Sequence, residues 1–218
     1  MSITEILAPI VVSFSQIIFS GNSENTITGE MLLMPGNEIF INVQEPLNQK
    51  MHIAANNTFI YYPDEKRAFN IEHNQSNLSM QNIPQIEPLD SNYYSHLGFK
   101  KVKKKVIRDT TIIQYISTAN KKTPSLITLK FVAGNTSQII LATNLGIANY
   151  LQFDFIEYAL FNQKKYIKNY SVSSYKNGEL IEKTTYYIKD IKNAENTDLE
   201  RIKFIIPPDI YIELKSFN

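Results

Sequence analysis

The chain has 218 residues, of which 43% are hydrophobic and 20% are charged, a balance typical of a globular protein with a sizeable apolar core. Its formal net charge of +1 gives no support for binding to nucleic acid or another polyanion. It contains no cysteine, which excludes disulfides, thiolate metal sites, a cysteine nucleophile and a lipid-modified cysteine. We expect a single domain over residues 1–218.

The N-terminal segment is apolar over residues 6–19 but does not have the pattern of a signal peptide or a membrane span. No basic segment precedes the apolar run, which is too short to cross a bilayer as a helix. Ser2 and Glu5 instead have the spacing of a capping box, which predicts a short helix over residues 3–8 and then the first strand. If the protein is exported, we expect that its signal sequence was removed ahead of Met1.

Residues 26–71 consist of short apolar runs separated by Pro, Gly, Asn and Asp. From Ile39 to Gln44 the side chains alternate between two faces, as in a β-strand. The separating groups suit tight turns, because Pro fixes φ and Gly, Asn and Asp tolerate left-handed geometry. The segment therefore predicts an antiparallel meander, with turns at residues 35–37, 45–48, 56–57 and 63–66.

Residues 72–98 are polar, rich in Asn and interrupted by Pro. They predict a long loop with one short helix, for which Asp90 is the N-cap and Gly98 the end. Two interpretations remain open. The segment is either a lid over an apolar interior or a surface loop attached by its aromatic side chains.

Strand-like segments resume after residue 98. The Asn177-Gly178 pair between two β-rich runs predicts a type I′ hairpin turn, and Ala133 to Thr136 predicts a second hairpin. Many short strands with few helices indicate a mainly β protein, for which both a half-open sheet and a closed lipocalin-like barrel fit. We expect strands over residues 102–107, 110–117, 126–133, 137–143, 148–158, 166–175 and 180–191.

Catalytic and cofactor motifs are missing from the sequence. There is no phosphate-binding glycine loop, no dinucleotide fingerprint, no zinc-protease helix motif and no serine nucleophile elbow. His52, His73 and His96 are far apart in the sequence, and none has a second ligand type at metal-binding spacing. We expect no catalytic residue, no metal site and no cofactor, and hence no enzyme.

Five lysines occur within residues 100–105. On a strand they would lie on both faces, which suits an exposed edge whose charges oppose pairing with another sheet. The alternative is a docking patch for an acidic partner or anionic headgroups, formed by Lys101, Lys103 and Lys105. Too few aromatic residues are interspersed for nucleic-acid binding.

Five short motifs lie between residues 13 and 210. They are Ser13 to Gln16, Gly29 to Pro35, Gln44 to Pro46, Tyr61 to Pro63 and Lys203 to Pro208. In their order and spacing they resemble the LolA family of periplasmic lipoprotein carriers, and the last motif resembles the family's closing strand, which implies a strand over residues 203–208.

The resemblance implies a mainly β fold with short helices, namely a curved, half-open antiparallel β-barrel of about eleven strands covered by helical lid segments. In the family an Arg that helps to close the lid precedes the first strand-ending Pro, but here this residue is Met34. We therefore predict a lid held by apolar contacts alone.

Pairs of apolar residues two positions apart recur along the predicted strands. Taken alone, they could fill a solid core, whereas the resemblance implies that they line a cavity for acyl chains. The residues expected to contact lipid are Leu32, Met34, Ile39, Ile41, Met51, Ile53, Phe59, Tyr61, Leu89, Tyr93, Leu97, Ile139, Leu141, Phe153 and Phe155.

The resemblance implies a monomeric periplasmic carrier. It would bind the acyl chains of lipoproteins, receive them from a LolCDE-type inner-membrane transporter and release them to an outer-membrane acceptor. Other interpretations are a LolB-like acceptor, a carrier of free lipid or glycolipid, an RseB-type sensor module, and a structural β-domain with a filled interior.

Overall fold

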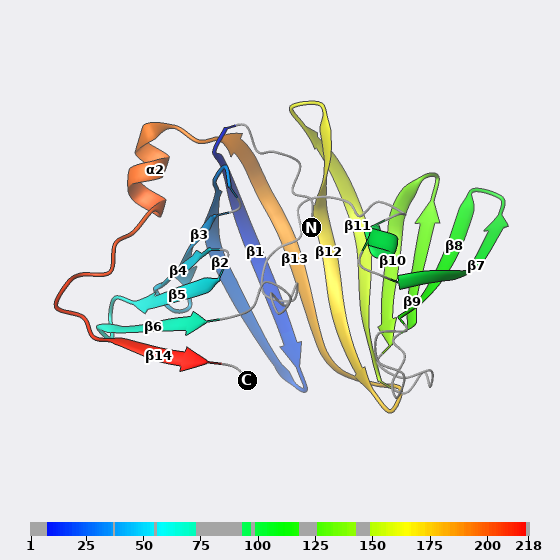
Figure 1. The fold of residues 1–218 in the computed structure, drawn as a ribbon, viewed down its shortest axis with the longest axis horizontal. Coiled ribbons are helices and arrows are strands. Elements are labelled where there is room, and N and C mark those ends of the chain that lie inside the picture. The colour runs from blue at the N-terminus through cyan, green and yellow to red at the C-terminus, as the bar shows by residue number, and fades with distance from the viewer. Residues whose placement is uncertain are drawn as a thin grey trace. The chain divides into compact units, whose positions relative to one another are not determined.

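A computed structural model describes residues 8–36, 38–54, 56–72, 93–96, 99–117, 126–142 and 149–216. These residues form a 14-stranded sheet and two short helices, labelled in Figure 1. The strand order is β14-β6-β5-β4-β3-β2-β1-β13-β12-β11-β10-β9-β8-β7, so the described pairings form an open sheet that ends on β14 and β7. Neither helix in these ranges has the length and apolar character needed to cross a membrane.

The chain divides into two compact units. The first unit comprises Met1–Gln16, Thr26–Ile83 and Ile188–Asn218, and the second comprises Ile17–Asn25 and Pro84–Tyr187. The single domain expected from the sequence stays a prediction.

The first unit contains the meander predicted over residues 26–71. Strands β2 to β6 pair with their sequence neighbours in antiparallel fashion, which confirms the meander. The C-terminal strand β14 departs from this pattern, since it runs parallel to β6. The elements are β1 (Ile10–Ser20), β2 (Ser23–Leu33), β3 (Ile39–Glu45), β4 (Gln49–Ile53), β5 (Asn57–Tyr62), β6 (Arg67–Glu72), α2 (Asn196–Ile202) and β14 (Ile212–Ser216).

The second unit consists mainly of consecutive antiparallel hairpins. Asn177 and Gly178 have φ values of 54° and 81°, as the predicted type I′ turn requires. Ala133 and Gly134, with φ of 47° and 78°, form the second predicted hairpin turn. The elements are α1 (Tyr93–His96), β7 (Phe99–Ile107), β8 (Thr110–Ser117), β9 (Leu126–Val132), β10 (Asn135–Ala142), β11 (Tyr150–Phe161), β12 (Lys164–Lys176) and β13 (Glu179–Asn193), whose last residues belong to the first unit.

The mainly β, antiparallel class is confirmed, whereas the predicted count of about eleven strands is too low. A closing strand over residues 203–208 is also wrong. This segment follows α2 and ends in Pro207 and Pro208, which have no N–H to donate to a ladder, and β14 begins only at Ile212.

The predicted lid falls largely outside the described residues. Within residues 72–98 the structure places one short helix, α1, where the sequence predicts a helix. Leu89, Leu97 and His73 lie outside the described residues, as does nearly all of the helix predicted over residues 3–8. Helical lid segments therefore stay a prediction.

Candidate apolar binding face

The first-unit sheet has two faces, which the strand register defines. Residues that pair directly across an antiparallel ladder point to the same side. One side, the Phe40 face, carries Leu32, Phe40, His52, Phe59 and Tyr61. The other side, the Ile41 face, carries Met31, Leu33, Ile39, Ile41, Val43, Met51, Ile53, Ile60, Phe69 and Ile71.

Helix α2 and the residues after it pack on the Phe40 face. The Phe204 ring lies edge-on to Phe40 at 6.3 Å between centroids and stacks over Tyr61 at 6.4 Å. The packing explains why an amphipathic segment of only seven residues is helical, since its apolar side is buried against the sheet. The buried cluster consists of Val11, Leu32, Phe40 and Ile202, with Met34, Ala194, Leu199 and Phe204 packed against it.

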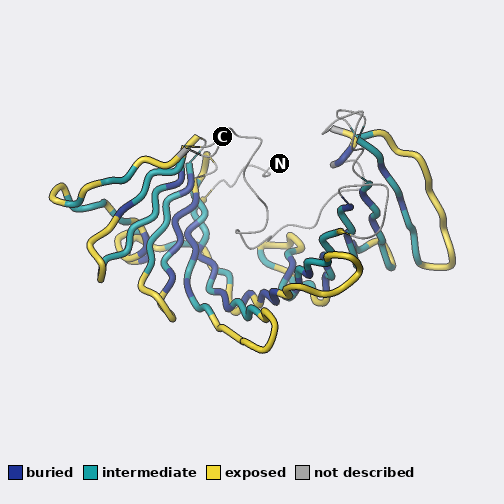
Figure 2. The backbone as a smooth tube through the Cα atoms, turned by 90° about the horizontal axis from the view of Figure 1, so that it is seen from below, coloured by how far each residue is buried: buried dark blue, intermediate teal, exposed yellow. Residues whose placement is uncertain are grey.

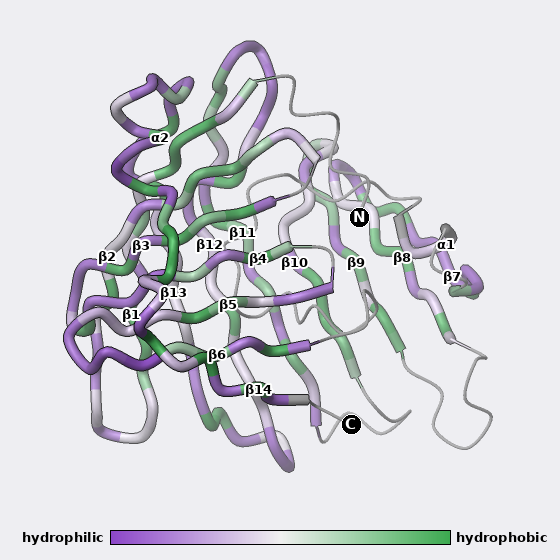
Figure 3. The backbone as a smooth tube through the Cα atoms, turned by 60° about the vertical axis from the view of Figure 1, so that its left-hand side comes forward, coloured by the Kyte–Doolittle hydropathy of each residue, from purple (hydrophilic) through white to green (hydrophobic). Residues whose placement is uncertain are grey.

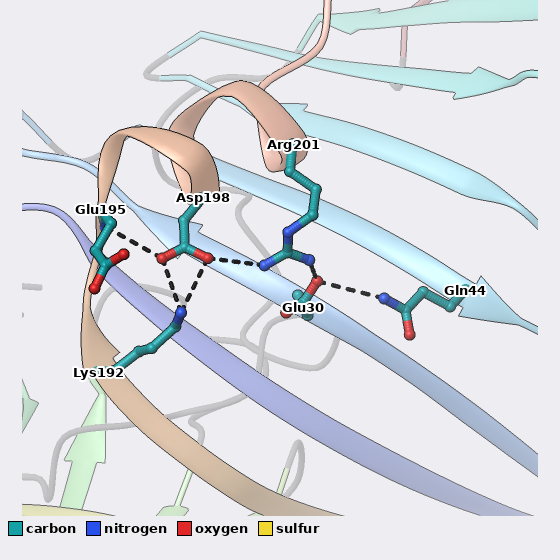
Figure 4. Close-up of polar contacts among 6 residues, drawn as sticks. All are labelled: Glu30, Gln44, Lys192, Glu195, Asp198 and Arg201. Carbon is teal, nitrogen blue, oxygen red and sulfur yellow. Dashed lines mark hydrogen bonds and ion pairs between the residues drawn. The ribbon is translucent and has the colours of Figure 1, made fainter.

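Three donors hold the Asp198 carboxylate, near the start of α2. The Lys192 ammonium lies 2.9 Å from Oδ2, the Glu195 backbone N–H donates to Oδ2 at 3.1 Å, and Arg201 Nη2 donates to Oδ1 at 2.9 Å (Figure 4). The hydrogen bonds from Lys192 and from the Glu195 backbone lower the pKa of Asp198. The Asp198 carboxylate therefore stays ionised at neutral pH and stabilises the first turn of α2.

The same helix is tied to β2 and β3. The Arg201 guanidinium forms an ion pair with Glu30 on β2, and Gln44 Nε2 on β3 donates to Glu30 Oε2 at 3.3 Å (Figure 4). The Glu30 side chain is only 15% exposed. Apolar packing and a connected polar network thus both hold α2 on the Phe40 face.

The Ile41 face is an apolar surface on the side of the sheet opposite α2. Its side chains on β3, β4 and β5 are all uncharged. Met31 and Ile41 are buried, whereas Met51, Ile60 and Phe69 are half-buried toward the outer strands. Figure 3 shows hydrophobic segments within these strands and hydrophilic segments at the turns. An apolar surface that includes unbranched methionine side chains suits a ligand with flexible hydrocarbon chains.

Two cations lie at the edge of the Ile41 face at β6. The Arg67 guanidinium lies 5.1 Å and the Lys215 ammonium 4.3 Å from the centroid of the Phe69 ring. Both cations face the π-electrons of the ring, an arrangement that keeps their charge at the rim of the apolar surface. The Arg67 guanidinium is also ion-paired with Glu65 at 3.8 Å and with Glu213 at 3.3 Å, so carboxylates of the protein offset part of the positive charge at this edge.

Gly29 on β2 is closely packed, near the edge of the Ile41 face that lies away from β6. A Cβ at Gly29 would lie 2.6 Å from the Asn42 carbonyl oxygen and 3.0 Å from Cζ of Phe14. The missing side chain therefore leaves room for the Phe14 ring against β2.

The second unit has an apolar face of its own, the Leu129 face. Ile113, Leu129, Ile139 and Phe153 are paired in one row across β8 to β11, and all four are buried. Tyr94 of α1 packs at the β7–β8 side of this face, within 6.1 Å of Tyr115 and 5.9 Å of Phe99 between ring centroids.

The opposite face of the second unit is polar. Gln138 and Gln152 each donate to the Asp154 carboxylate at 2.8 Å, and Gln114 donates to Thr128 at 3.4 Å. Hydrogen-bonded polar side chains thus lie on this face, whereas the row from Ile113 to Phe153 on the Leu129 face is apolar.

The structure separates the residues predicted to contact lipid. The Ile41 face brings together Ile39, Ile41, Met51 and Ile53, and the Leu129 face brings together Ile139, Leu141, Phe153 and Phe155. Leu32, Phe59 and Tyr61 lie on the Phe40 face, and Met34 packs in its cluster. Tyr93 begins α1, and its side chain lies outside the described residues, as do Leu89 and Leu97.

Sequence reasoning missed Ile60, Phe69 and Ile71 on the Ile41 face. Their alternation along β5 and β6 was the available signal, but assigning them to this face needs the register. Phe59 and Ile60 are adjacent in the sequence and both are apolar. Only the pairing of Ile60 with Met51 shows that Ile60, and not Phe59, lies on the Ile41 face.

The predicted docking lysines also lie on different faces. An irregularity between Lys101 and Lys103 leaves Lys101 opposite Tyr115, on the Leu129 face, whereas Lys103 and Lys105 lie on the polar face. All three side chains are exposed. Their docking role stays a prediction.

His52 packs as an aromatic residue of the Phe40 face. Its ring stacks on Phe40 at 4.2 Å with an interplanar angle of 3°, and Nε2 lies 3.9 Å from Glu38, beyond hydrogen-bond distance. Burial lowers the pKa of His52, against the opposing effect of Glu38. Within the described ranges, no group of three His, Asp or Glu side chains is placed to hold a metal ion.

No protein-family model and no curated protein sequence matches this chain. Among solved structures, a LolA superfamily protein from Nitrosomonas europaea matches with a TM-score of 0.59 and 8% identity, covering 93% of both chains. A domain from Vibrio parahaemolyticus, named for outer membrane lipoprotein sorting, matches with a TM-score of 0.57 and 14% identity over 89% of this chain and 90% of that one.

A third solved structure, a DUF1329 family protein from Desulfovibrio piger, matches with a TM-score of 0.60 and 9% identity over 92% of this chain and 91% of that one. The three structures share their fold with this chain along almost its whole length, although only 8–14% of the residues are identical. The chain has a LolA-like fold.

Proposed function

We propose that the protein is a periplasmic carrier that binds the acyl chains of lipoproteins and transfers them toward the outer membrane. The LolA-like fold and the likeness to a domain named for outer membrane lipoprotein sorting support this role. The observation that carries the proposal is the Ile41 face, an uncharged apolar surface over β3, β4 and β5 on the side of the sheet that α2 leaves uncovered.

The physical need for such a carrier comes from the acyl chains. Keeping a chain in water costs about 0.8 kcal/mol per CH₂ group, or roughly 12 kcal/mol for a chain of about fifteen groups. An apolar face of several strands offsets this cost without any covalent step. The unbranched Met51 side chain would repack around chains of different length.

The proposed partners are those that the resemblance to the LolA family implies. The sequence has no nucleotide-binding motif that could supply energy for the transfer. Without its own energy source, the carrier would receive its cargo from an energised LolCDE-type transporter in the inner membrane. It would then release the cargo to an outer-membrane acceptor that binds the acyl chains more tightly. We expect the carrier to act as a monomer.

Native mass spectrometry of the protein purified from the periplasm of cells that overproduce a lipoprotein tests this function. We expect a one-to-one complex with the acylated lipoprotein and none with a form whose acylated cysteine is replaced. Complexes with phospholipid or glycolipid alone would instead indicate a carrier of free lipid. No complex of either kind, from a folded protein, would contradict the proposal.

Variants on the two faces of β5 localise the binding surface. Ile60→Ser, on the Ile41 face, is expected to lower the fraction of complex, whereas Tyr61→Ser, on the Phe40 face, serves as the matched control. Circular dichroism of both variants confirms that they fold. Equal loss of complex in the two variants would remove the Ile41 face from the account.

A further inference from the structure

The hairpin formed by β7 and β8 has an unusual concentration of positive charge. Residues 99–117 contain six basic side chains and one acidic one, a net charge of +5, so the rest of the chain carries −4. The lysines of β7 are exposed, as the outer strand at the right of Figure 2 shows by its colour. In the described part of the chain, no ion pair neutralises any of these five lysines, which are Lys100, Lys101, Lys103, Lys104 and Lys105.

Exposed apolar side chains are interspersed among these lysines. Val102, Val106 and Ile107 are 49%, 60% and 49% exposed, although the paired strands β8 and β9 bury their apolar residues on the Leu129 face. Val106 and Ile107 directly precede the turn at Arg108, which has a positive φ of 53°. The tip of the hairpin therefore carries two branched apolar side chains beside the Arg108-Asp109 turn.

Protection of a sheet edge explains only part of this pattern. β7 is an end strand of the sheet, and lysines on an end strand oppose pairing with another sheet. Exposed valine and isoleucine have the opposite effect, because they favour association. A surface that combines both kinds of side chain suits a partner that is anionic outside and apolar just beneath, which is the chemistry of a membrane surface.

We propose that the β7–β8 hairpin docks the protein onto anionic lipid membranes. Lys100, Lys103 and Lys105 lie on the polar face of the sheet and Lys101 and Lys104 on the Leu129 face, so headgroups can approach the edge of the strand from both sides. Val106 and Ile107 enter the interface at the tip. This docking surface is separate from the proposed carrier function and could serve any protein that works at a bilayer.

Vesicle flotation tests the docking surface with the full chain. The two probes are vesicles of phosphatidylcholine alone and vesicles of an equal mixture of phosphatidylcholine and phosphatidylglycerol. We expect the protein to float with the anionic vesicles only and to dissociate as salt is raised, since salt screens the lysine charges. Equal binding to both vesicles, or to neither, would overturn the inference; an acidic protein partner is then the remaining explanation for the lysines.

Matched charge variants show whether the position of the lysines matters. The triple variant Lys103→Gln, Lys104→Gln, Lys105→Gln loses three charges from β7. The control triple Lys164→Gln, Lys176→Gln, Lys183→Gln loses three exposed charges from other strands. Each lysine close to an anionic surface changes partitioning by about fivefold, so the β7 triple is expected to bind roughly a hundredfold more weakly. An equal loss in the control triple would contradict a localised docking surface.

Insertion of the hairpin tip is tested separately. The double variant Val106→Ser, Ile107→Ser keeps the charge of the hairpin and removes its exposed apolar side chains. We expect weaker binding to anionic vesicles at every salt concentration. Unchanged binding would overturn the part of the inference that places the tip within the interface.

Discussion

The Glu30 carboxylate on β2 forms an ion pair with the guanidinium of Arg201 on α2. Through Asp198, the same guanidinium is connected to Lys192 at the end of β13. Met34, at the position where the resemblance to the LolA family implies a lid-closing Arg, packs within the apolar cluster beneath α2. Whether apolar contacts alone hold the lid predicted over residues 72–98 stays a prediction.

A double-mutant cycle measures the link between β2 and α2. Glu30→Gln and Arg201→Gln, alone and together, are compared by urea unfolding. Because Glu30 is largely buried and Arg201 is 44% exposed, we expect a coupling energy of about 1 kcal/mol after solvent screening. Additive effects of the two substitutions would show that the pair contributes nothing to stability.

Between pH 7 and pH 5 we expect the free energy of unfolding to depend on the protonation of His52. Burial lowers the pKa of His52 in the folded protein below the ordinary value of 6.5, so the unfolded chain takes up the proton first as the pH falls. The free energy of unfolding therefore decreases below about pH 6.5. The neighbouring Glu38 opposes this shift, and Lys203 adds to it.

The measurement compares unfolding of the native protein with that of His52→Gln across this pH range. The variant has no titrating group at position 52, and we expect its free energy of unfolding to change less with pH. Parallel pH profiles for the two proteins would show that the pKa of His52 is not lowered by folding.

The close approach at Gly29 predicts that even a methyl group is harmful there. In Gly29→Ala the new Cβ would meet the Asn42 backbone carbonyl at 2.6 Å, and a strand backbone cannot move away cheaply. We expect a loss of about 1–3 kcal/mol, measured by urea unfolding. Replacing Phe14 by Leu in the same chain should recover only part of this loss, since the carbonyl contact remains. An unchanged free energy of unfolding in Gly29→Ala would contradict the packing.

Two leucines of the second unit provide a matched test of its core. Leu129 is fully buried at 0% exposure, whereas Leu160 is 71% exposed. Leu129→Ala is expected to destabilise the protein by about 2–5 kcal/mol because it leaves a cavity, and Leu160→Ala by less than about 0.5 kcal/mol. Similar losses for both variants would show that Leu129 is not a core residue.

Local sequence signals predicted the hairpins and the strands well. The Asn177-Gly178 turn was predictable because the two positive φ values of a type I′ turn strongly favour this pair. Helix α2 was missed because it is only seven residues long, which is too short for a clear helical periodicity in the sequence. Its signal was the spacing of Glu195 and Asp198, and most of its stability comes from packing on the Phe40 face.

The sequence could not show that the residues predicted to contact lipid lie on different faces of the sheet. Side-chain alternation groups Phe59 with Tyr61 and Met51 with Ile53, but it does not say which pairs share a face. A shift of one residue in register exchanges the faces, and hydrogen bonding across whole strands determines the register. Only the pairing of Met51 with Ile60 places the half-buried apolar residues of β4 and β5 together.

Site-specific photocrosslinking tests the acyl-binding face most directly. A photoreactive phenylalanine analogue is placed at Ile60 or at Tyr61, two consecutive half-buried residues on opposite faces of β5. Each protein is then irradiated with a lipoprotein that carries isotopically labelled acyl chains. The account predicts labelled crosslinks from position 60 and few from position 61. Equal crosslinking from both positions, or none from position 60 in a protein that retains the lipoprotein, would contradict it.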